Sequence, residues 1–350
     1  MSSPVSIRDV AARAGVSVGT VSNVLNRPEI VAKVTRDNVH AAIDALGFVR
    51  NEPARQLRAG RSRIIGLVVL DVANPFFTDM ARGVEDEASA SGLSVMLCNS
   101  DEQPDRESRY LDLLEEQRVH GILITPFGEP GDRVAGLQRR GTPVILVDAQ
   151  SPLGSQCSVS VDDVVGGELA VAHLIEAGHD KIAFIGGPAS LRQVADRYEG
   201  AVRALTRAGR SATDLMVLDT PALNVAGGQR AGVQLATMPG PARPTAVFCA
   251  NDLVALGFLQ EMTRQRIHVP DDIAIVGYDD IEFAAAAAVP LSSVRQPRQE
   301  LGRTAAQLLL DETSRLGRHK HRQVVFQPEL VVRRSSQSAS ERAQPVGAER

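Results

Sequence analysis

The sequence contains no tryptophan, and aromatic residues make up only 3% of its 350 residues. The core must therefore be aliphatic, and a site that stacks a ring-shaped ligand has few aromatic side chains available. Cysteine is also scarce: Cys98, Cys157 and Cys249 form neither a CxxC pair nor a disulfide framework. Such cysteine usage is typical of a reducing compartment, so the expected localisation is cytoplasmic.

Long apolar runs are missing as well. The longest, Ile64–Leu70, is far shorter than the ~20 residues of a membrane helix, and the polar start of the chain lacks the apolar region of a secretory signal. We expect no membrane partner. No GxGxxG, GxxxxGK[ST] or HExxH pattern occurs. His319-Lys320-His321 is interpreted as a solvated basic loop, so neither a metal nor a cofactor is expected.

Charge is distributed unevenly along a chain long enough for two or three domains. The net charge of −4 combines +5 on residues 1–63 with −9 on the remainder. A basic head on an acidic body indicates a polyanion-binding module attached to a second functional part. Chance clustering of charged residues is the alternative.

The head has the apolar spacing of three short helices, separated by a glycine turn and an Asn-Arg-Pro break. This pattern predicts an all-α helix-turn-helix DNA-binding head over residues 1–47. The expected helices are Ser6–Ala14, Ser17–Asn26 and Thr35–Leu46. Ser6 and Asp9 resemble a capping box, and Gly15 and Gly47 are the expected stops of the first and third helices.

The second helix would serve as the recognition helix. Its groove-facing side would carry Val18, Gly19, Ser22 and Asn23. The amides at its start, which Ser17 caps, and the Thr20 hydroxyl could meet phosphates.

The string from Ser6 to Asn26 strongly resembles the lactose/galactose repressor (LacI/GalR) family, through Asp-Val-Ala, Ala-Gly-Val-Ser and Thr-Val-Ser in the family's order. In that family the positions of Val18, Gly19 and Asn23 select base pairs. Asn23 is the one of the three able to bond base edges, unless it is merely solvated. The expected DNA-binding residues are Ser17, Val18, Gly19, Thr20, Ser22, Asn23 and Asn26 in the head and Arg55, Leu57 and Arg58 beyond it.

Residues 48–63 are predicted to be a hinge-helix linker. Ala54-Arg-Gln-Leu-Arg58 matches the family's hinge motif, which implies that paired hinge helices enter the minor groove and that Leu57 wedges into the central base step. An incidental exposed leucine is the alternative. Glu52 and Pro53 depart from the small residues usual there, which leaves the start of this helix open.

The body alternates short apolar runs with amphipathic helices, which predicts parallel sheets covered on both faces. We expect two doubly wound parallel-sheet lobes of the periplasmic-binding-protein type over residues 64–334, an α/β body, and a flexible tail over 335–350. Chain crossings between the lobes are expected near Asp162, Pro290 and Arg322. The expected strands are Ile64–Leu70, Ser94–Asn99, Gly121–Thr125, Pro143–Asp148, Lys181–Gly186, Leu215–Asp219, Ala246–Ala250 and Ile273–Gly277.

The body also resembles the LacI/GalR family, through Asp71-Val-Ala-Asn-Pro-Phe-Phe77, Asn251-Asp252 and Gly277-Tyr-Asp279. The resemblance implies an effector between the lobes. The phenylalanines would stack on it, acids at strand ends would accept its hydroxyls, and arginines would donate to it. Core packing, turn roles and a surface salt bridge are the respective alternatives. The expected effector-binding residues are Phe76, Phe77, Asp148, Arg192, Arg197, Leu223, Asn251 and Asp279.

Three positions depart from sugar-binding relatives. Ala195 stands where an arginine is frequent, Asp163 replaces a frequent asparagine, and Leu223 replaces an aromatic wall. The sequence therefore predicts a homodimeric transcriptional repressor that binds near-palindromic operator DNA and is controlled by a small molecule, most simply a sugar. An α/β enzyme and a sugar-transport protein are the competing interpretations; the former lacks a catalytic constellation and the latter a secretory signal.

Overall fold

The computed structural model describes six stretches of the chain: residues 5–48, 62–128, 131–151, 154–188, 190–315 and 319–337. The chain divides into two compact units, residues 1–62 and 63–350. No helix among the described residues is long and apolar enough to cross a membrane.

The first unit is a three-helix head with its own aliphatic core. Its helices are α1 (Ile7–Ala14), α2 (Val18–Asn26) and α3 (Lys33–Leu46), with a 3-10 turn at Pro28–Ile30. Val10, Val21, Val24 and Val39 are buried at their junction, as the helical spacing of apolar residues predicts.

Local capping explains most of the helix ends. Ser6 and Asp9 form the reciprocal capping box that the sequence indicates, and Ser17 accepts the backbone N–H of Thr20. Gly15 and Gly47 end α1 and α3 in the left-handed conformation, with φ of 67° and 61°. The predicted start of the third helix at Thr35 is wrong: α3 begins two residues earlier, after Ala32, without a side-chain cap.

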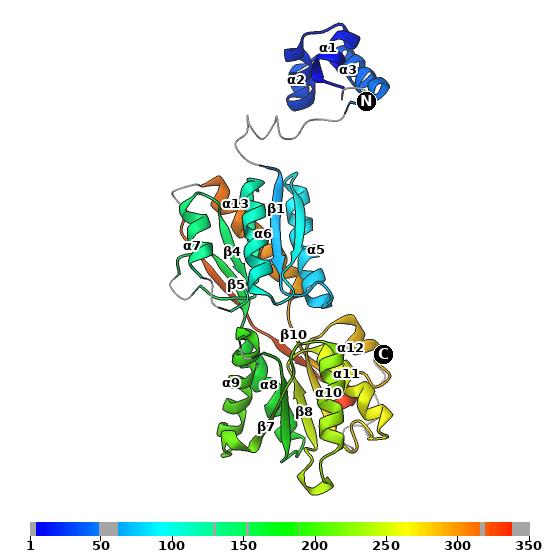
Figure 1. The fold of residues 1–350 in the computed structure, drawn as a ribbon, viewed down its shortest axis with the longest axis vertical. Helices are drawn as coiled ribbons and strands as arrows, with labels where there is room; N and C mark the ends of the chain where they lie inside the picture. Colours follow the sequence, from blue (N-terminus) through cyan, green and yellow to red (C-terminus); the bar gives the residue numbers. More distant parts are fainter. Residues whose placement is uncertain are drawn as a thin grey trace, which may run out of the picture. The chain divides into compact units, whose positions relative to one another are not determined.

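The second unit contains two six-stranded sheets (Figure 1). Sheet A has the order β11-β5-β4-β3-β1-β2 and is parallel throughout; sheet B has the order β12-β10-β9-β8-β6-β7 and is parallel except for β12. The strands of sheet A are β1 (Ile64–Val69), β2 (Ser94–Asn99), β3 (Gly121–Ile124), β4 (Val144–Val147), β5 (Ser158–Val161) and β11 (Gln323–Phe326). Those of sheet B are β6 (Ile182–Gly186), β7 (Leu215–Asp219), β8 (Ala246–Cys249), β9 (Ala274–Asp279), β10 (Ser292–Arg295) and β12 (Glu329–Val331).

Helices cover both faces of each sheet, so each lobe is a three-layer doubly wound unit, as expected. Lobe A is the lobe built on sheet A, and lobe B the lobe built on sheet B. In lobe A, α5 and α13 cover one face of the sheet and α6 and α7 the other. In lobe B, α8 and α9 cover one face of the sheet and α10 and α11 the other. The helices are α5 (Pro75–Ala90), α6 (Pro104–Glu116), α7 (Asp132–Arg139), α8 (Asp163–Glu176), α9 (Arg192–Arg207), α10 (Val225–Ala236), α11 (Asp252–Arg264), α12 (Glu282–Ala286) and α13 (Arg298–Ser314).

The chain crosses between the lobes three times, and the sequence located one of these crossings. The crossing after β5 lies at Asp162, as predicted. The other two lie at Gln296-Pro297 and Gln327-Pro328, not near Pro290 and Arg322, because β10 and β11 each add a strand before the chain leaves its lobe.

The expected flexible tail over residues 335–350 is wrong at its start. Ser335 and Ser336 form a buried 3-10 turn with Arg334. The Ser335 hydroxyl donates to the Ile275 carbonyl at 2.6 Å, and the Ser336 hydroxyl lies 2.7 Å from His173 Nε2. These two serines therefore attach the segment around Arg334 to lobe B.

Reciprocal glycines bring three helix pairs into backbone contact. A Cβ on Gly167 of α8 would lie 2.0 Å from the Arg197 carbonyl oxygen of α9, and a Cβ on Gly200 of α9 would lie 2.0 Å from the Val164 carbonyl oxygen of α8. The pairs α10–α11 and α5–α13 repeat this arrangement. No larger residue fits there without separating the helices.

Candidate DNA-binding face and effector pocket

One side of α2 is not covered by the other described residues of the head. Val21 and Val24 face the core, whereas Val18, Gly19 and Asn23 are exposed. Three of the four predicted outward positions are therefore exposed in the structure, and the fourth, Ser22, is half-buried, as is Thr20. Ser17 and Asn26 are exposed at the two ends.

Packing within the head does not account for Gly19. It has no positive φ, and a Cβ there would only approach the Ser17 hydroxyl at an ordinary 3.6 Å. Inside a helix, glycine costs about 1 kcal/mol relative to alanine. The head therefore carries a destabilising residue on its exposed helix face, where close approach by a partner would benefit from the missing side chain.

Two of the predicted polar contacts have local partners. The Thr20 hydroxyl lies 2.9 Å from that of Ser17, and Asn26 Nδ2 donates to the Ser22 carbonyl at 2.9 Å. No hydrogen bond or ion pair engages the Asn23 side chain within the described head. The three linker residues named from the sequence, Arg55, Leu57 and Arg58, lie outside the described residues.

A pocket lies between the two lobes, at the carboxyl ends of their strands, where doubly wound sheets bind ligands. Five apolar and eight polar residues line it: Leu70, Phe76, Phe77, Leu191 and Leu223, and Asp71, Asn74, Glu102, Asp148, Gln193, Arg197, Asn251 and Asp279.

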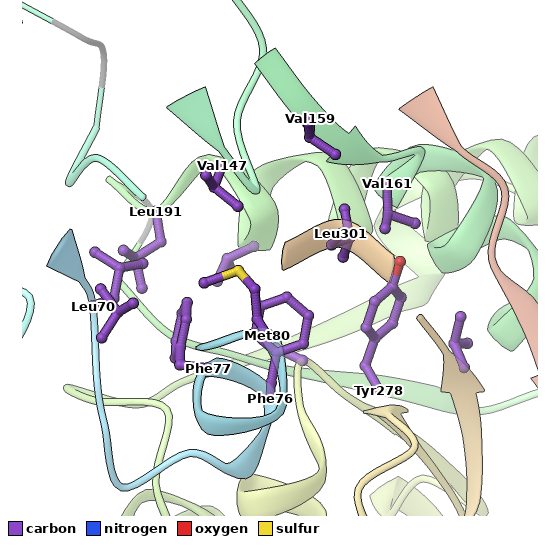
Figure 2. Close-up of a cluster of buried hydrophobic side chains, with 14 of the residues drawn as sticks. Leu70, Phe76, Phe77, Met80, Val147, Val159, Val161, Leu191, Tyr278 and Leu301 are labelled. Carbon is purple, nitrogen blue, oxygen red and sulfur yellow. The ribbon is translucent and has the colours of Figure 1, made fainter. Parts of the chain in front are cut away.

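The apolar wall comes from the start of α5 and from the segment before α9. Phe76 and Phe77 are both buried, and their rings meet edge to face with centroids 5.0 Å apart. Figure 2 shows the Phe77 ring beside Leu70 and Leu191, and the Phe76 ring beside Met80. Both phenylalanines thus belong to the core and line the pocket, so the core and ligand interpretations are compatible.

Asp148 follows β4 and is held in an unusual conformation. Its φ of 55° lies in the left-handed region, which residues other than glycine rarely adopt. Gln193 from lobe B donates to its Oδ2 at 2.9 Å, while its Oδ1 is buried and has no hydrogen-bond partner among the described residues. Burial, reinforced by the charge of Asp163, raises the pKa of Asp148 well above its usual range.

Asp279 ends β9 and has a φ of 103°. It accepts hydrogen bonds from Asn74 of lobe A at 3.2 Å and from Gln296 of the second crossing at 2.8 Å. Burial raises the pKa of Asp279, while the Arg197 guanidinium and these two hydrogen bonds act in the opposite direction. The residue therefore joins both lobes at the pocket.

Arg197 is fixed at the base of the pocket. Its Nε donates to Asp163 at 2.9 Å, its Nη1 donates to the Ala250 carbonyl at 2.6 Å, and its guanidinium lies 3.7 Å from the centroid of the Tyr278 ring. Burial acts to lower the pKa of Arg197, but the surrounding acids, Asp163 first, hold it above its usual value. Arg197 lines the pocket, as predicted. The salt bridge that was the alternative also exists, but it is buried rather than on the helix surface.

Seven of the eight residues predicted for the effector site line this pocket. Asn251 caps α11 and donates to the Leu223 carbonyl at 3.0 Å, so these two residues meet at the rim. Arg192 is the exception: its exposed side chain pairs with Asp196 one helical turn away, and it is not among the lining residues.

Sequence reasoning missed six lining residues: Leu70, Asp71, Asn74, Glu102, Leu191 and Gln193. Glu102 follows β2 in a turn with φ of 54°, and burial, followed by the charges of Asp71 and Asp101, raises its pKa. A polar residue just after a predicted strand was the available signal for Glu102. Gln193 carried no such signal, because it lies within the first turn of a helix.

Comparison with known proteins shows the relationship of both parts. Residues 6–51 match the lacI family of bacterial regulatory proteins, and residues 171–336 match the periplasmic binding protein-like domain. The "HTH-type transcriptional repressor PurR" of Photobacterium profundum is 33% identical over 94% of this chain and 98% of its own length. The "Ribose operon repressor" of Escherichia coli (strain K12) is 36% identical over 87% and 92%.

Solved structures agree with these relationships. A lac repressor dimer bound to operator and the anti-inducer ONPF superposes with a TM-score of 0.82 at 27% identity, covering 95% of this chain and 99% of that one. The transcriptional regulator CelR in complex with cellobiose gives 0.69 at 31% identity, covering 95% and 99%. This chain therefore belongs to the lacI family of DNA-binding transcriptional regulators.

Proposed function

We propose that the protein is a homodimeric repressor, not an enzyme, whose operator affinity is set by a sugar bound between the lobes. In this assignment residues 1–47 read the operator, residues 48–63 form the hinge and residues 64–334 bind the effector and dimerise. Membership of a family whose curated relatives are named repressors supports this assignment. Because a two-fold dimer reads two-fold DNA, the operator is near-palindromic.

The proposed reading head uses the exposed side of α2. Asn23 bonds a base edge, Val18 contacts a thymine methyl group, and Gly19 permits close approach to the groove. Phosphates would meet Ser17, Thr20 and the α2 amides, with Ser22 and Asn26 beside them. In the linker, Leu57 would act as the minor-groove wedge, flanked by Arg55 and Arg58.

One observation carries the proposed ligand class: the pocket is lined by four carboxylates, Asp71, Glu102, Asp148 and Asp279, and by one guanidinium. Carboxylate oxygens accept hydrogen bonds from hydroxyl groups, and the free Oδ1 of Asp148 needs such a donor. A phosphate or carboxylate ligand would find one lining guanidinium, that of Arg197, which is already paired with Asp163. The ligand is therefore a neutral polyhydroxy compound whose apolar face packs on the phenylalanine wall.

The same pocket provides the coupling to DNA. Asn74–Asp279 and Gln193–Asp148 are hydrogen bonds between the lobes, so a ligand that binds these acids acts on the lobe arrangement. It can shift the equilibrium only by its differential affinity for the two arrangements, typically about 1–3 kcal/mol.

A ligand panel tests the proposal. Neutral mono- and disaccharides, sugar phosphates and nucleobases are compared by thermal shift and calorimetry, and each ligand that binds is then titrated into protein–operator complexes. We expect binding only among the neutral sugars, and a weakening of about 10- to 150-fold in Asp279→Ala, which loses a charged hydrogen bond. Arg192→Ala is the matched control and should respond like the wild type. Binding of a sugar phosphate instead, or an unchanged response in Asp279→Ala, would contradict this ligand assignment.

A further inference from the structure

Four potential metal ligands converge in lobe A, away from the pocket. They are Cys157, Glu312, His319 and His321, and their ligand atoms all lie within 4.8 Å of one another. Cys157 directly precedes β5, Glu312 lies in the last turn of α13, and the histidines precede β11. Because β5 and β11 are parallel neighbours, the cluster lies at their amino ends, whereas the pocket lies at the carboxyl ends of the strands.

Three of the six distances between ligand atoms in this cluster are close to those of a tetrahedral metal site, and the others are at most 4.8 Å. Cys157 Sγ lies 3.0 Å from His319 Nε2 and 3.9 Å from His321 Nδ1. His321 Nδ1 lies 3.8 Å from Glu312 Oε2. With Zn–S of ~2.3 Å and Zn–N of ~2.0 Å, ligand atoms of a tetrahedral site are about 3.5 Å apart. Each of these pairs is within about half an ångström of that spacing.

Three of the four ligand side chains are largely shielded from solvent, while that of His321 is 34% exposed. Cys157 is fully buried, and the side chains of His319 and Glu312 are 5% and 12% exposed. Glu312 Oε2 is buried and has no hydrogen-bond partner among the described residues. A buried polar group without a partner is unfavourable, and a cation would supply the partner that Glu312 lacks.

Neighbouring groups orient the ligands as in known metal sites. Asp311 Oδ2 lies 3.3 Å from His319 Nδ1, which leaves His319 Nε2 directed at the cysteine. The backbone N–H of Arg322 donates to Cys157 Sγ at 3.3 Å. A carboxylate behind a histidine ligand fixes its tautomer and ring orientation, and an amide donor stabilises a thiolate.

We propose that Cys157, His319, His321 and Glu312 bind one zinc(II) ion as a closed, four-coordinate site. A thiolate, two imidazoles and a carboxylate suit zinc, and four protein ligands leave no open position for catalysis. The ion fastens the end of α13 and the segment before β11 to the start of β5. The interpretation of His319-Lys320-His321 as a solvated loop is therefore replaced, because its partners Cys157 and Glu312 are distant in sequence.

The test uses the full-length protein, stripped with a chelator and titrated with zinc(II) under chelator competition. We expect one zinc ion per chain, and cobalt(II) substitution should give a thiolate-to-cobalt charge-transfer band with the intense visible bands of tetrahedral cobalt. Cys157→Ser and His319→Gln should weaken zinc binding at least about 100-fold, and Asp311→Asn about 10- to 100-fold. Cys98→Ser, a buried cysteine of the same lobe, and His268→Gln are the matched controls and should bind like the wild type.

Two results would overturn the site. The first is a wild-type protein that binds no stoichiometric zinc, or that binds cobalt without the thiolate band, and this measurement needs no variant to fold. The second is zinc binding in Cys157→Ser or His319→Gln that equals binding in the two controls.

Discussion

The contact between α8 and α9 allows a sharp test of the packing argument through Gly200→Ala. The added Cβ would lie 2.0 Å from the Val164 carbonyl oxygen, whereas real Cβ atoms essentially never come within 3.0 Å of such an atom. The two helices must therefore separate by about 1 Å or distort, and they carry Arg197 and Asp163 on facing turns.

Two opposing effects set the size of the change. Alanine is favoured over glycine inside a helix by about 1 kcal/mol, while overpacking of a close contact costs about 1–3 kcal/mol, occasionally more. Because the obstacle is backbone rather than a flexible side chain, the upper end applies. We expect a net loss of about 2 kcal/mol, which corresponds to a Tm lower by about 4–8 °C for a unit of this size.

Urea and thermal unfolding followed by circular dichroism measure this loss. Gly136→Ala in α7 is the matched control, since its Cβ would meet only the end of the Arg140 side chain at 3.1 Å, and it should be neutral or stabilising. The double variant Gly167→Ala/Gly200→Ala should lose less than the sum of the two single losses, because one separation relieves both contacts. If Gly200→Ala were as stable as Gly136→Ala, the backbone contact would not limit residue size there.

Three further outcomes are expected. Gly19→Ala should stabilise the head by up to about 1 kcal/mol in thermal unfolding, yet weaken operator binding in salt-matched titrations; unchanged binding would remove Gly19 from the DNA-facing set. Asn23→Ala should relax preference at one base pair per half-site by about 1–3 kcal/mol, and equal weakening on every duplex would identify a phosphate contact instead. Because the pKa of Asp148 is raised in the folded state, the contribution of this residue to stability is complete at acid pH and is lost as pH rises through the folded-state pKa. The stability of Asp148→Asn relative to the wild type should therefore increase from pH 5 to pH 8. A difference in the free energy of unfolding that stays constant over this range would contradict this.

Local patterns predicted the fold well where each element carried its own signal. The head's caps at Ser6 and Ser17 and its glycine stops are short-range features, and they were read correctly. The missed strands β5, β10, β11 and β12 are only three or four residues long, and residues such as Ser158 and Ser292 interrupt their apolar pattern. Without these strands the second and third crossings were misplaced, although Gln-Pro marks both.

The candidate site was predictable to the extent that it lies at strand ends. Asp148, Asn251 and Asp279 follow buried strands, and parallel strands bring their carboxyl ends together. Arg192 and Gln193 show the limit: they are adjacent on α9, but only the rotation of that helix decides that Gln193 reaches Asp148 while Arg192 faces Asp196. The cluster of Cys157, Glu312, His319 and His321 could not be predicted from local sequence patterns, since Cys157 and His319 are 162 positions apart.

The two later crossings have a consequence for biosynthesis. Lobe A begins at β1, yet its helix α13 and strand β11 follow the whole of α8 to β10 in the chain. Gly83 of α5 receives its partner, the Gln299 backbone, only after more than two hundred further residues have been translated. Lobe A therefore emerges from the ribosome with the α13-facing side of α5 and the outer edge of β5 uncovered, while most of lobe B is made in one continuous stretch. Chaperone protection during synthesis would matter most for this early, unfinished lobe.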